Sequence, residues 1–381
     1  MAVKLKNVIE AVAREKNVPE EIVEKALIDG IRTAVKKEFG YKNNVIVDFD
    51  KENDELKVYL RKKITPFVEN PKRDISLSEA QKLNPEAQVG EYIDVPLDLE
   101  NIGRIALSVA KDVISKKISR VEKNILYKEF KDLEGKVITG TVRRFEGNDI
   151  IVDLGRVEAV LPEEEQIKKE KYKVGDRVRA LVLKVLKDKS YPIYEKGKVK
   201  RYIKPIDRDK PLVILSRTHP EFLRKLIEIE VPEVVEGDIE IKAIAREPGE
   251  RAKVAVWTED KNVDPVGVVV GLKGKRIQNV SLELSDEKID VIEWHPDPAQ
   301  FIIRALSPAH PKKWNLIPDE KRIEVAVPKN ELSLAIGKGG INAKLAHKLT
   351  GWHIDILSEE DFDRLQELAK NKAETNKTEA N

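Results

Sequence analysis

Apolar residues recur at helical spacing in the first third of the chain. Residues 17–21 carry a proline and two glutamates that open a helix, which Gly40 is predicted to end. Its expected buried stripe comprises Ile22, Ala26, Leu27, Ile31, Ala34 and Val35. From 99 to 130 the helical spacing returns and predicts a helix of roughly 25 to 30 residues, or about 40 Å.

Between these two helices, apolar and polar residues alternate instead. The alternation at 45–49 and 56–60 predicts a hairpin, and 92–97 predicts a further strand. Residues 1–130 are therefore expected to form an α+β domain with a long connecting helix. They contain no nucleotide loop and no catalytic constellation, which favours a protein-binding domain.

Five short apolar runs follow, punctuated by glycine and proline. They cover 136–142, 149–155, 157–161, 176–185 and 211–216. Five short strands suit an OB-fold, so residues 131–217 are predicted to be a five-stranded β-barrel. The spacing of Gly-x-Val at 140–142, Val-Asp-Leu-Gly at 152–155 and Leu-Pro at 161–162 resembles the OB-fold of the ribosomal S1 type. An insertion at 188–210 separates the last two strands.

The last third of the chain repeats one order of elements: strand, strand, helix, Gly-x-x-Gly, helix, strand. In the first copy, alternation at 239–245 and 252–257 predicts a hairpin, and Asp264 with Pro265 predicts a helix start. Residues 268–270 have strand propensity, but the repeat favours a helix there. The loop itself is Gly271, Leu272, Lys273 and Gly274, and a strand at 288–292 closes the copy.

The second copy has a strand at 322–327, Asn330 as the expected cap of a helix at 331–336, and a closing strand at 352–357. Its loop is Gly337, Lys338, Gly339 and Gly340. Two tandem type II KH domains are predicted, at 218–307 and 308–358, with a helix at 299–306 closing the first. Residues 359–381 are expected to be a polar tail that starts as a helix and becomes disordered.

A KH loop binds single-stranded RNA because its glycines let the sugar-phosphate backbone lie against bare main chain, while neighbouring cations meet the phosphates. The candidate cations here are Lys273, Lys275, Arg276, Lys338 and Lys344. Prolines between the two copies predict a stiff link, so that one strand could cross both loops. Apolar residues beside the loops, Val269, Ile277, Val280, Ile336 and Ile341, could border bases but are better explained as core.

The barrel offers Phe145 beside Arg143 and Arg144 for RNA, although a spacer role stays open. Within 184–210, ten Lys or Arg stand against four Asp or Glu, with tyrosines at 191, 194 and 202. Lys198, Lys200 and Arg201 are candidate RNA contacts in this segment. A solvated hairpin would have the same composition, and the sequence does not separate the two interpretations.

Composition limits the other possibilities. Cysteine is absent, Met occurs only at position 1, and 36% of residues are charged with a net charge of +2. We therefore expect no thiolate zinc site, and a cytoplasmic protein from a hot environment. No apolar run approaches a membrane span, and the five histidines show no metal-binding spacing, so no membrane, metal, cofactor or catalytic site is expected.

The order of domains resembles the NusA family of bacterial transcription elongation, termination and antitermination factors. The resemblance is densest in the strings at 215–223, 228–233, 264–267, 287–292 and 349–352, and it covers nearly the whole chain. It implies that residues 1–130 bind RNA polymerase core, that the barrel and KH domains hold nascent RNA, and that other Nus factors take part. A monomer is expected.

Two features depart from this family. The insertion at 188–210 is longer than the connection expected there, and the acidic carboxy-terminal repeats of some relatives are absent. Two other kinds of function share the RNA-binding features. One is an RNA chaperone or regulator of translation or ribosome assembly; the other is an accessory part of an exoribonuclease system.

Overall fold

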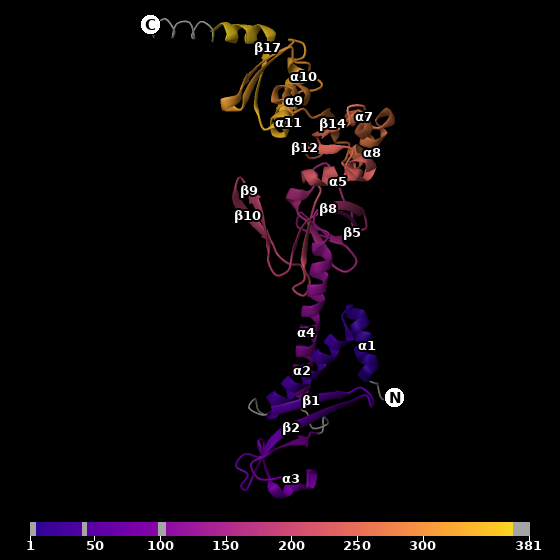
Figure 1. Ribbon diagram of the computed structural model, residues 1–381, viewed down its shortest axis with the longest axis vertical. Helices are drawn as coiled ribbons and strands as arrows, with labels where there is room; N and C mark the ends of the chain where they lie inside the picture. Colours follow the sequence, from indigo (N-terminus) through magenta and orange to yellow (C-terminus); the bar gives the residue numbers. More distant parts are fainter. Residues whose placement is uncertain (1–4, 40–43, 98–103, 369–381) are drawn as a thin grey trace, which may run out of the picture. The chain divides into compact units, whose positions relative to one another are not determined.

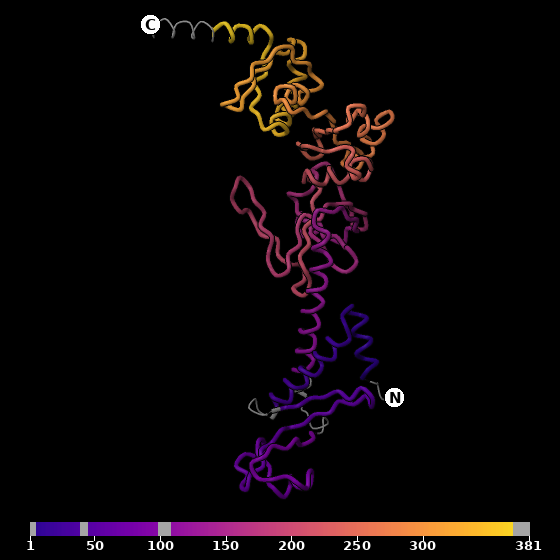
Figure 2. The backbone as a smooth tube through the Cα atoms, in the orientation of Figure 1, coloured from indigo at the N-terminus to yellow at the C-terminus, as the bar shows by residue number. Residues whose placement is uncertain are grey.

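The computed structural model describes residues 5–39, 44–97 and 104–368 (Figures 1 and 2). The chain divides into two compact units. The first holds residues 1–132 with 186–190 and 204–212, and the second holds 133–185, 191–203 and 213–381.

The first unit is a sheet flanked by helices, as the alternating pattern predicts. Its elements are α1 (Leu5–Lys16), α2 (Glu20–Phe39), β1 (Asn44–Asp50), β2 (Glu55–Thr65), β3 (Asp74–Ser76), α3 (Leu77–Leu83), β4 (Tyr92–Pro96) and α4 (Arg104–Lys131). Strand β2 pairs antiparallel with β1 and β4, and parallel with β3. The helix α1 and the small lobe formed by β3 and α3 were not predicted.

Helices α2 and α4 form the main helical contact of this unit. A Cβ built on Gly30 of α2 would lie 2.6 Å from Ile114 Cγ1 of α4, so only glycine allows this approach. Of the predicted stripe, Ala26, Ala34 and Val35 are buried. The predicted start of the long helix and the glycine expected to end α2 lie outside the described residues, but the 28-residue length of α4 confirms the predicted size.

The five predicted strands close into a barrel in the second unit. They are β5 (Val137–Glu146), β6 (Asp149–Asp153), β7 (Glu158–Leu161), β8 (Arg177–Leu186) and β11 (Leu212–Ser216), in the order β11-β7-β6-β5-β8. Gly140 lies where β5 approaches β6, since a Cβ there would meet Val152 Cγ1 at 2.4 Å. The insertion forms a separate two-stranded sheet of β9 (Tyr191–Glu195) and β10 (Lys198–Ile203), seen as an arm in Figure 2.

The first predicted KH domain follows the barrel. Its elements are α5 (Pro220–Glu230), α6 (Pro232–Glu236), β12 (Glu240–Glu247), β13 (Arg251–Trp257), α7 (Pro265–Val270), α8 (Lys275–Glu283) and β14 (Lys288–Glu293). Strand β13 pairs antiparallel with β12 and parallel with β14. The helix predicted over the three valines is present, and Asp264 caps it by accepting from Val266 N.

This domain is joined to the barrel through shared core and a buried arginine. Ile167 and Leu181 of the barrel pack in one apolar cluster with Phe222 and its neighbours on α5. Arg217, between β11 and α5, pairs with Glu170 at 2.6 Å and with Glu283 at 3.0 Å. The barrel and the first domain therefore form one packed body.

The second copy repeats the same order with one strand that was not located in the sequence. Its elements are α9 (Pro298–Ala305), β15 (Lys313–Ile317), β16 (Arg322–Val327), α10 (Leu332–Ile336), α11 (Ile341–Thr350) and β17 (His353–Ser358). Strand β16 pairs antiparallel with β15 and parallel with β17, as in the first copy. Glu331, and not Asn330 as predicted, occupies the cap position of α10, because the chain turns one residue later.

Helix α9 was expected to close the first domain, but its packing differs. Its residues Phe301 and Ile302 share an apolar cluster with Leu345 and Ala346 of α11 and with Ala255 of β13. The helix thus occupies in the second copy the place before the first strand that α5 occupies in the first. Residues 359–368 are helical, as predicted, with Phe362 buried; the rest of the predicted tail lies outside the described residues.

Candidate nucleic-acid interface

The two glycine loops have matching backbone conformations. Gly271 has φ +75° and ψ 174°, and Gly337 has φ +76° and ψ 166°, a combination open only to glycine. A Cβ on Gly337 would lie 2.9 Å from the backbone N of Asn342, and one on Gly271 would lie 2.7 Å from Cγ of Arg276. In each loop the glycine lets the following helix approach within contact distance.

The third residue of each loop is left-handed. Gly339 has φ +63°, and Lys273 occupies the same place in the first loop with φ +53°. A lysine in this conformation costs about 1–2 kcal/mol relative to the usual backbone, so its side chain is held on a strained turn. Such strain is concentrated at functional sites. Leu272 beside it is 86% exposed, which leaves the tip of the loop uncovered.

The candidate cations of the loops divide into two groups. Lys273, Lys275 and Lys338 are exposed and have no ion-pair partner among the described residues. Arg276 instead donates to both carboxylate oxygens of Glu233, at 3.0 and 3.1 Å, and to the Val268 carbonyl.

The remaining cation, Lys344 on α11, pairs across the two copies. It lies 2.9 Å from Glu247 of β12, which also accepts from Lys348 at 2.5 Å. Burial opposes the charge on Glu247, but the two lysines outweigh it and lower the pKa of this carboxyl. This cross-copy contact could not be read from the sequence, because the partners are about a hundred residues apart.

The arginines of the barrel are paired with nearby acids. Arg144 donates to Glu158 at 2.8 Å and to Glu146, while Arg143 lies 3.1 Å from Glu158. These hydrogen bonds, first the one to Glu158, raise the pKa of Arg144. Phe145, which follows them on β5, is 43% exposed. Their charge is therefore partly neutralised, which weakens the attraction of this strand for phosphate.

The candidate residues of the insertion also divide into unpaired and paired cations. Lys198 is exposed and has no ion-pair partner in the described part of the chain, whereas Lys200 lies 3.4 Å from Glu164. Arg201 donates to Asp149 at 2.5 and 2.6 Å and to Glu164 at 2.7 Å. It is thus attached to the barrel rather than free for an incoming ligand.

The apolar residues beside the loops are mostly core, as the sequence favoured. Val269 is 0% and Val280 is 2% exposed, and both belong to the cluster shared with α5. Ile277 and Ile341 are partly buried against their domain cores. Ile336 is 39% exposed and is the one of the five that is open enough to touch a base.

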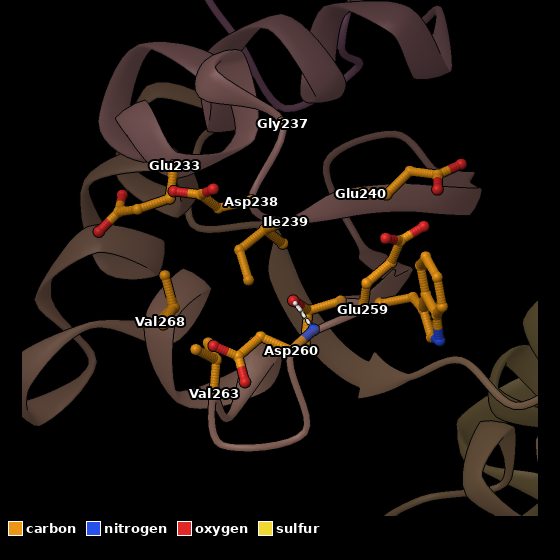
Figure 3. A pocket seen from close by; sticks show the side chains of 11 residues that line it. Glu233, Gly237, Asp238, Ile239, Glu240, Glu259, Asp260, Val263 and Val268 are labelled. Atoms are coloured by element: carbon orange, nitrogen blue, oxygen red, sulfur yellow. Dashed lines mark hydrogen bonds between the residues drawn. The ribbon is translucent and has the colours of Figure 1, made fainter.

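A pocket of about 560 Å³ lies in the first copy, and Glu233, the partner of Arg276, lines it. Its rim carries five carboxylates: Glu233, Asp238, Glu240, Glu259 and Asp260 (Figure 3). Like charges repel, so this hollow is unsuited to a phosphate backbone. We do not assign it to RNA.

Comparison with known families agrees with this division of the chain. Family models match residues 4–124 as the NusA N-terminal domain and 131–197 as the S1 RNA-binding domain. Two others match 217–294 and 298–364 as the NusA-like first and second KH domains.

Relatives match almost end to end. Transcription termination/antitermination protein NusA of Halalkalibacterium halodurans is 40% identical over 92% of this chain and 87% of its own. The proteins of the same name from Bacillus subtilis and Thermus thermophilus are each 40% identical, over 96% and 95% of this chain and 93% and 91% of their own. The chain belongs to the NusA family.

For this NusA-family chain, the family models divide the KH region just before α9, a helix that packs against both KH domains. The second KH model begins at residue 298, with the start of α9, and not at the predicted 308. The domain therefore gains the helix that shares its core. The S1 model ends at residue 197, inside the β9–β10 hairpin.

Two findings concern metal ligands and membrane-spanning helices in the described residues. Among them, no group of three or more His, Cys, Asp or Glu is placed to hold a metal ion. No helix in the described ranges has the length and apolar character needed to cross a membrane. The relatives are named as transcription termination/antitermination proteins, and this chain itself matches models of an S1 RNA-binding domain and NusA-like KH domains.

Proposed function

We propose that this chain is a bacterial transcription elongation factor that acts in the cytoplasm. Residues 1–130 bind RNA polymerase core, and the S1 barrel and KH domains bind nascent single-stranded RNA. The factor modulates pausing, intrinsic termination and, with other Nus factors, antitermination. The observation that carries this proposal is the pair of matching glycine loops within one packed body.

The packing of the two KH domains supports a continuous RNA site. Their shared apolar cluster and the pairing of Glu247 with Lys344 and Lys348 hold both loops in one frame. A strand held by one loop then meets the other at a high effective concentration, so two weak sites act as one tighter site. The unpaired Lys273 and Lys338 supply charge at each loop.

The RNA site can be tested by placing acids in the loops. Leu272→Asp with Lys273→Asp alters the first loop, and Lys338→Asp with Gly339→Asp alters the second. Aspartate tolerates the left-handed backbone of the third loop position better than most residues, so the fold should persist. We expect each pair to weaken binding of a spanning RNA at least tenfold and the four together to lose less than the sum. Losses that simply add would contradict coupled binding.

The role in transcription can be tested with single-round transcription by bacterial RNA polymerase over a hairpin pause. We expect the full chain to lengthen the pause, and residues 131–381 alone to bind RNA without doing so. The loop variants of the full chain separate polymerase binding from RNA binding, because they leave residues 1–130 intact. If neither form altered pausing and polymerase did not co-purify, an RNA chaperone would be favoured instead.

A further inference from the structure

The arm formed by β9 and β10 has two unlike faces. Residues directly opposite each other in an antiparallel pair lie on the same face. Ile193 lies opposite Arg201, and Ile203 opposite Tyr191. Ile193 and Ile203 are 5% and 6% exposed, and Arg201 reaches Asp149 at the start of β6. This inner face attaches the arm to the barrel.

The outer face is apolar and open. Tyr194 lies opposite Val199, and Tyr202 lies opposite Pro192. Tyr194, Val199 and Tyr202 are 63%, 42% and 59% exposed. Since Tyr202 lies opposite Pro192, two residues from Tyr194 on the same strand, the two tyrosines are offset by about 7 Å along the arm. Two aromatic side chains are thus exposed on one face of the arm, on neighbouring strands.

A bulge at Lys200 creates this division. The register advances one residue on β9 but two on β10 between Val199 and Arg201, so Lys200 is extra. If Lys200 were instead a regular member of the ladder, Val199 and Arg201 would lie two residues apart on one face, and Tyr202 would pair with Tyr191 on the inner face. The bulge at Lys200 therefore places Arg201 on the inner face and Tyr202 on the outer face.

We propose that the outer face of this arm, built around Tyr194 and Tyr202, is a stacking surface for unpaired RNA bases. It is additional to the glycine loops and to the barrel. The inference rests on the proposed function and adds to it a specific ligand surface. It also changes the roles expected within the insertion: the tyrosines contact bases, whereas Arg201 positions the arm.

Charge favours RNA as the occupant over an acidic or apolar protein partner. The turn of the arm is formed by Lys196 and Gly197, both with positive φ, and Lys198 follows at once. Lys196 and Lys198 have no ion-pair partner among the residues described, and Glu195 is the one acid within the two strands and turn. Lys196 in the turn and Lys198, which lies opposite Glu195 on the inner face, place positive charge at the tip of the arm. Aromatic rings next to such a tip fit a base-and-phosphate chain, because every base can stack whatever its sequence.

The test uses the full chain and a labelled unstructured RNA of about 20 nucleotides, long enough to exceed a single barrel site. Tyr194→Ala with Tyr202→Ala removes the rings. Tyr194→Phe with Tyr202→Phe is the matched control, since it keeps the rings and removes the hydroxyls. We expect the alanine pair to weaken binding between about fivefold and a hundredfold, as loss of one or two stacked bases would, and the phenylalanine pair less than about twofold.

Photocrosslinking with thiouridine RNA gives a second readout, with adducts expected on residues 191–203 of the parent chain. Equal RNA affinity of the parent and the alanine pair, with no adduct on the arm, would overturn the inference while leaving the proposed function intact. Failure of the parent chain itself to bind RNA would overturn the proposed function. Unchanged RNA affinity with loss of a co-purifying protein would reassign the face to a protein partner.

Discussion

At the scale of single residues, the glycines that begin the two loops are harder to replace than the glycines that end them, because both the backbone conformation and the neighbouring atoms exclude a side chain at the first position. Gly337 has a backbone conformation reserved for glycine and would clash with the backbone of Asn342. Gly340 is left-handed, and a Cβ there would meet nothing within 4 Å. The glycines that a sequence motif treats alike are therefore physically different.

We expect Gly337→Ala to lower the free energy of unfolding by about 3 kcal/mol or more, and Gly340→Ala by about 1 kcal/mol. Urea denaturation followed by tryptophan fluorescence checks this, because all four tryptophans, at 257, 294, 314 and 352, lie in the KH domains. Equal losses for the two variants would contradict the difference in backbone strain.

A buried ion pair is a second feature at the residue scale in which each side chain depends on the other. Arg246 donates to Glu287 at 2.8 and 2.9 Å, and both side chains are fully buried. Glu287 also accepts from Gly249 N at 2.7 Å, which holds the turn between β12 and β13. Removing one charge leaves the other buried without compensation.

Glu287→Gln is therefore expected to destabilise the first KH domain by about 3–5 kcal/mol. Asp363→Asn is the control, because its pair with Lys313 is exposed and should contribute less than about 1 kcal/mol. The shift in the thermal unfolding midpoint measures both. A small effect of Glu287→Gln would show that water or a rearranged partner satisfies Arg246.

At the scale of elements, periodicity was a reliable guide wherever a segment packs on its own neighbours. The barrel strands, the KH hairpin and the long helix follow from local alternation or helical spacing. Residues 268–270 are the segment where local propensity predicts the wrong structure. Its three valines favour a strand, but the cap at Asp264 and the burial of Val269 make the segment helical. The repeat revealed this where propensity could not.

Other features could not be derived because their cause lies far away in the chain. Helix α9 belongs with α11, some forty residues later, and the local sequence gives no sign of that contact. The candidate cations were found by type and position, but Arg276, Lys344 and Arg201 find acids contributed by distant elements. Ion pairing depends on tertiary neighbours, which the sequence does not show. Several cations that the sequence marked as candidate phosphate contacts are therefore paired with acids in the structure.

The attachment of the arm should depend on pH. Hydrogen bonds from Arg201, the largest influence, lower the pKa of Glu164 from 4.5 to about 2. A carboxyl with a depressed folded-state pKa stabilises the fold above its unfolded pKa and loses that contribution as the pH falls through the folded value. The attachment should therefore be complete at pH 6 and weaken between about pH 4.5 and pH 2.

NMR order parameters of residues 191–203 at pH 6 and pH 3 test this. We expect the arm to become more mobile at pH 3 in the parent chain, and Arg201→Met to be mobile at both values. Mobility that rose on acidification in Arg201→Met as well would place the pH effect outside this pair.

At the scale of the whole molecule, a net charge of +2 conceals where attraction for RNA arises. Most cations of the candidate interface are paired with acids. Of the loop cations, Lys273, Lys275 and Lys338 have no ion-pair partner in the described part of the chain. Association with single strands depends on salt with a slope of about −0.7 for each phosphate neutralised. These three lysines alone then account for a slope of about −2 in log affinity against log salt.

Replacing the three lysines by glutamine should make that slope shallower by about 2. Lys344→Gln is the matched control: it removes the same charge from a residue already paired with Glu247, so it should change the slope by less. Fluorescence anisotropy over a salt series measures both. If Lys344→Gln changed the slope as much as the loss of each unpaired lysine does, Lys344 would have to exchange Glu247 for a phosphate when RNA binds.

The shared cores also set an order for synthesis. Ile167 and Leu181 of the barrel share an apolar cluster with α5 and the rest of the first KH domain, and the sheet of the first KH domain shares one with α11 of the second. Because a chain emerges from its amino end, each domain waits on the ribosome with an uncovered apolar surface until the next has been made. A pause in translation after the barrel or after the first KH domain would therefore leave an apolar surface exposed to solvent. The nascent chain should aggregate most readily at these two points.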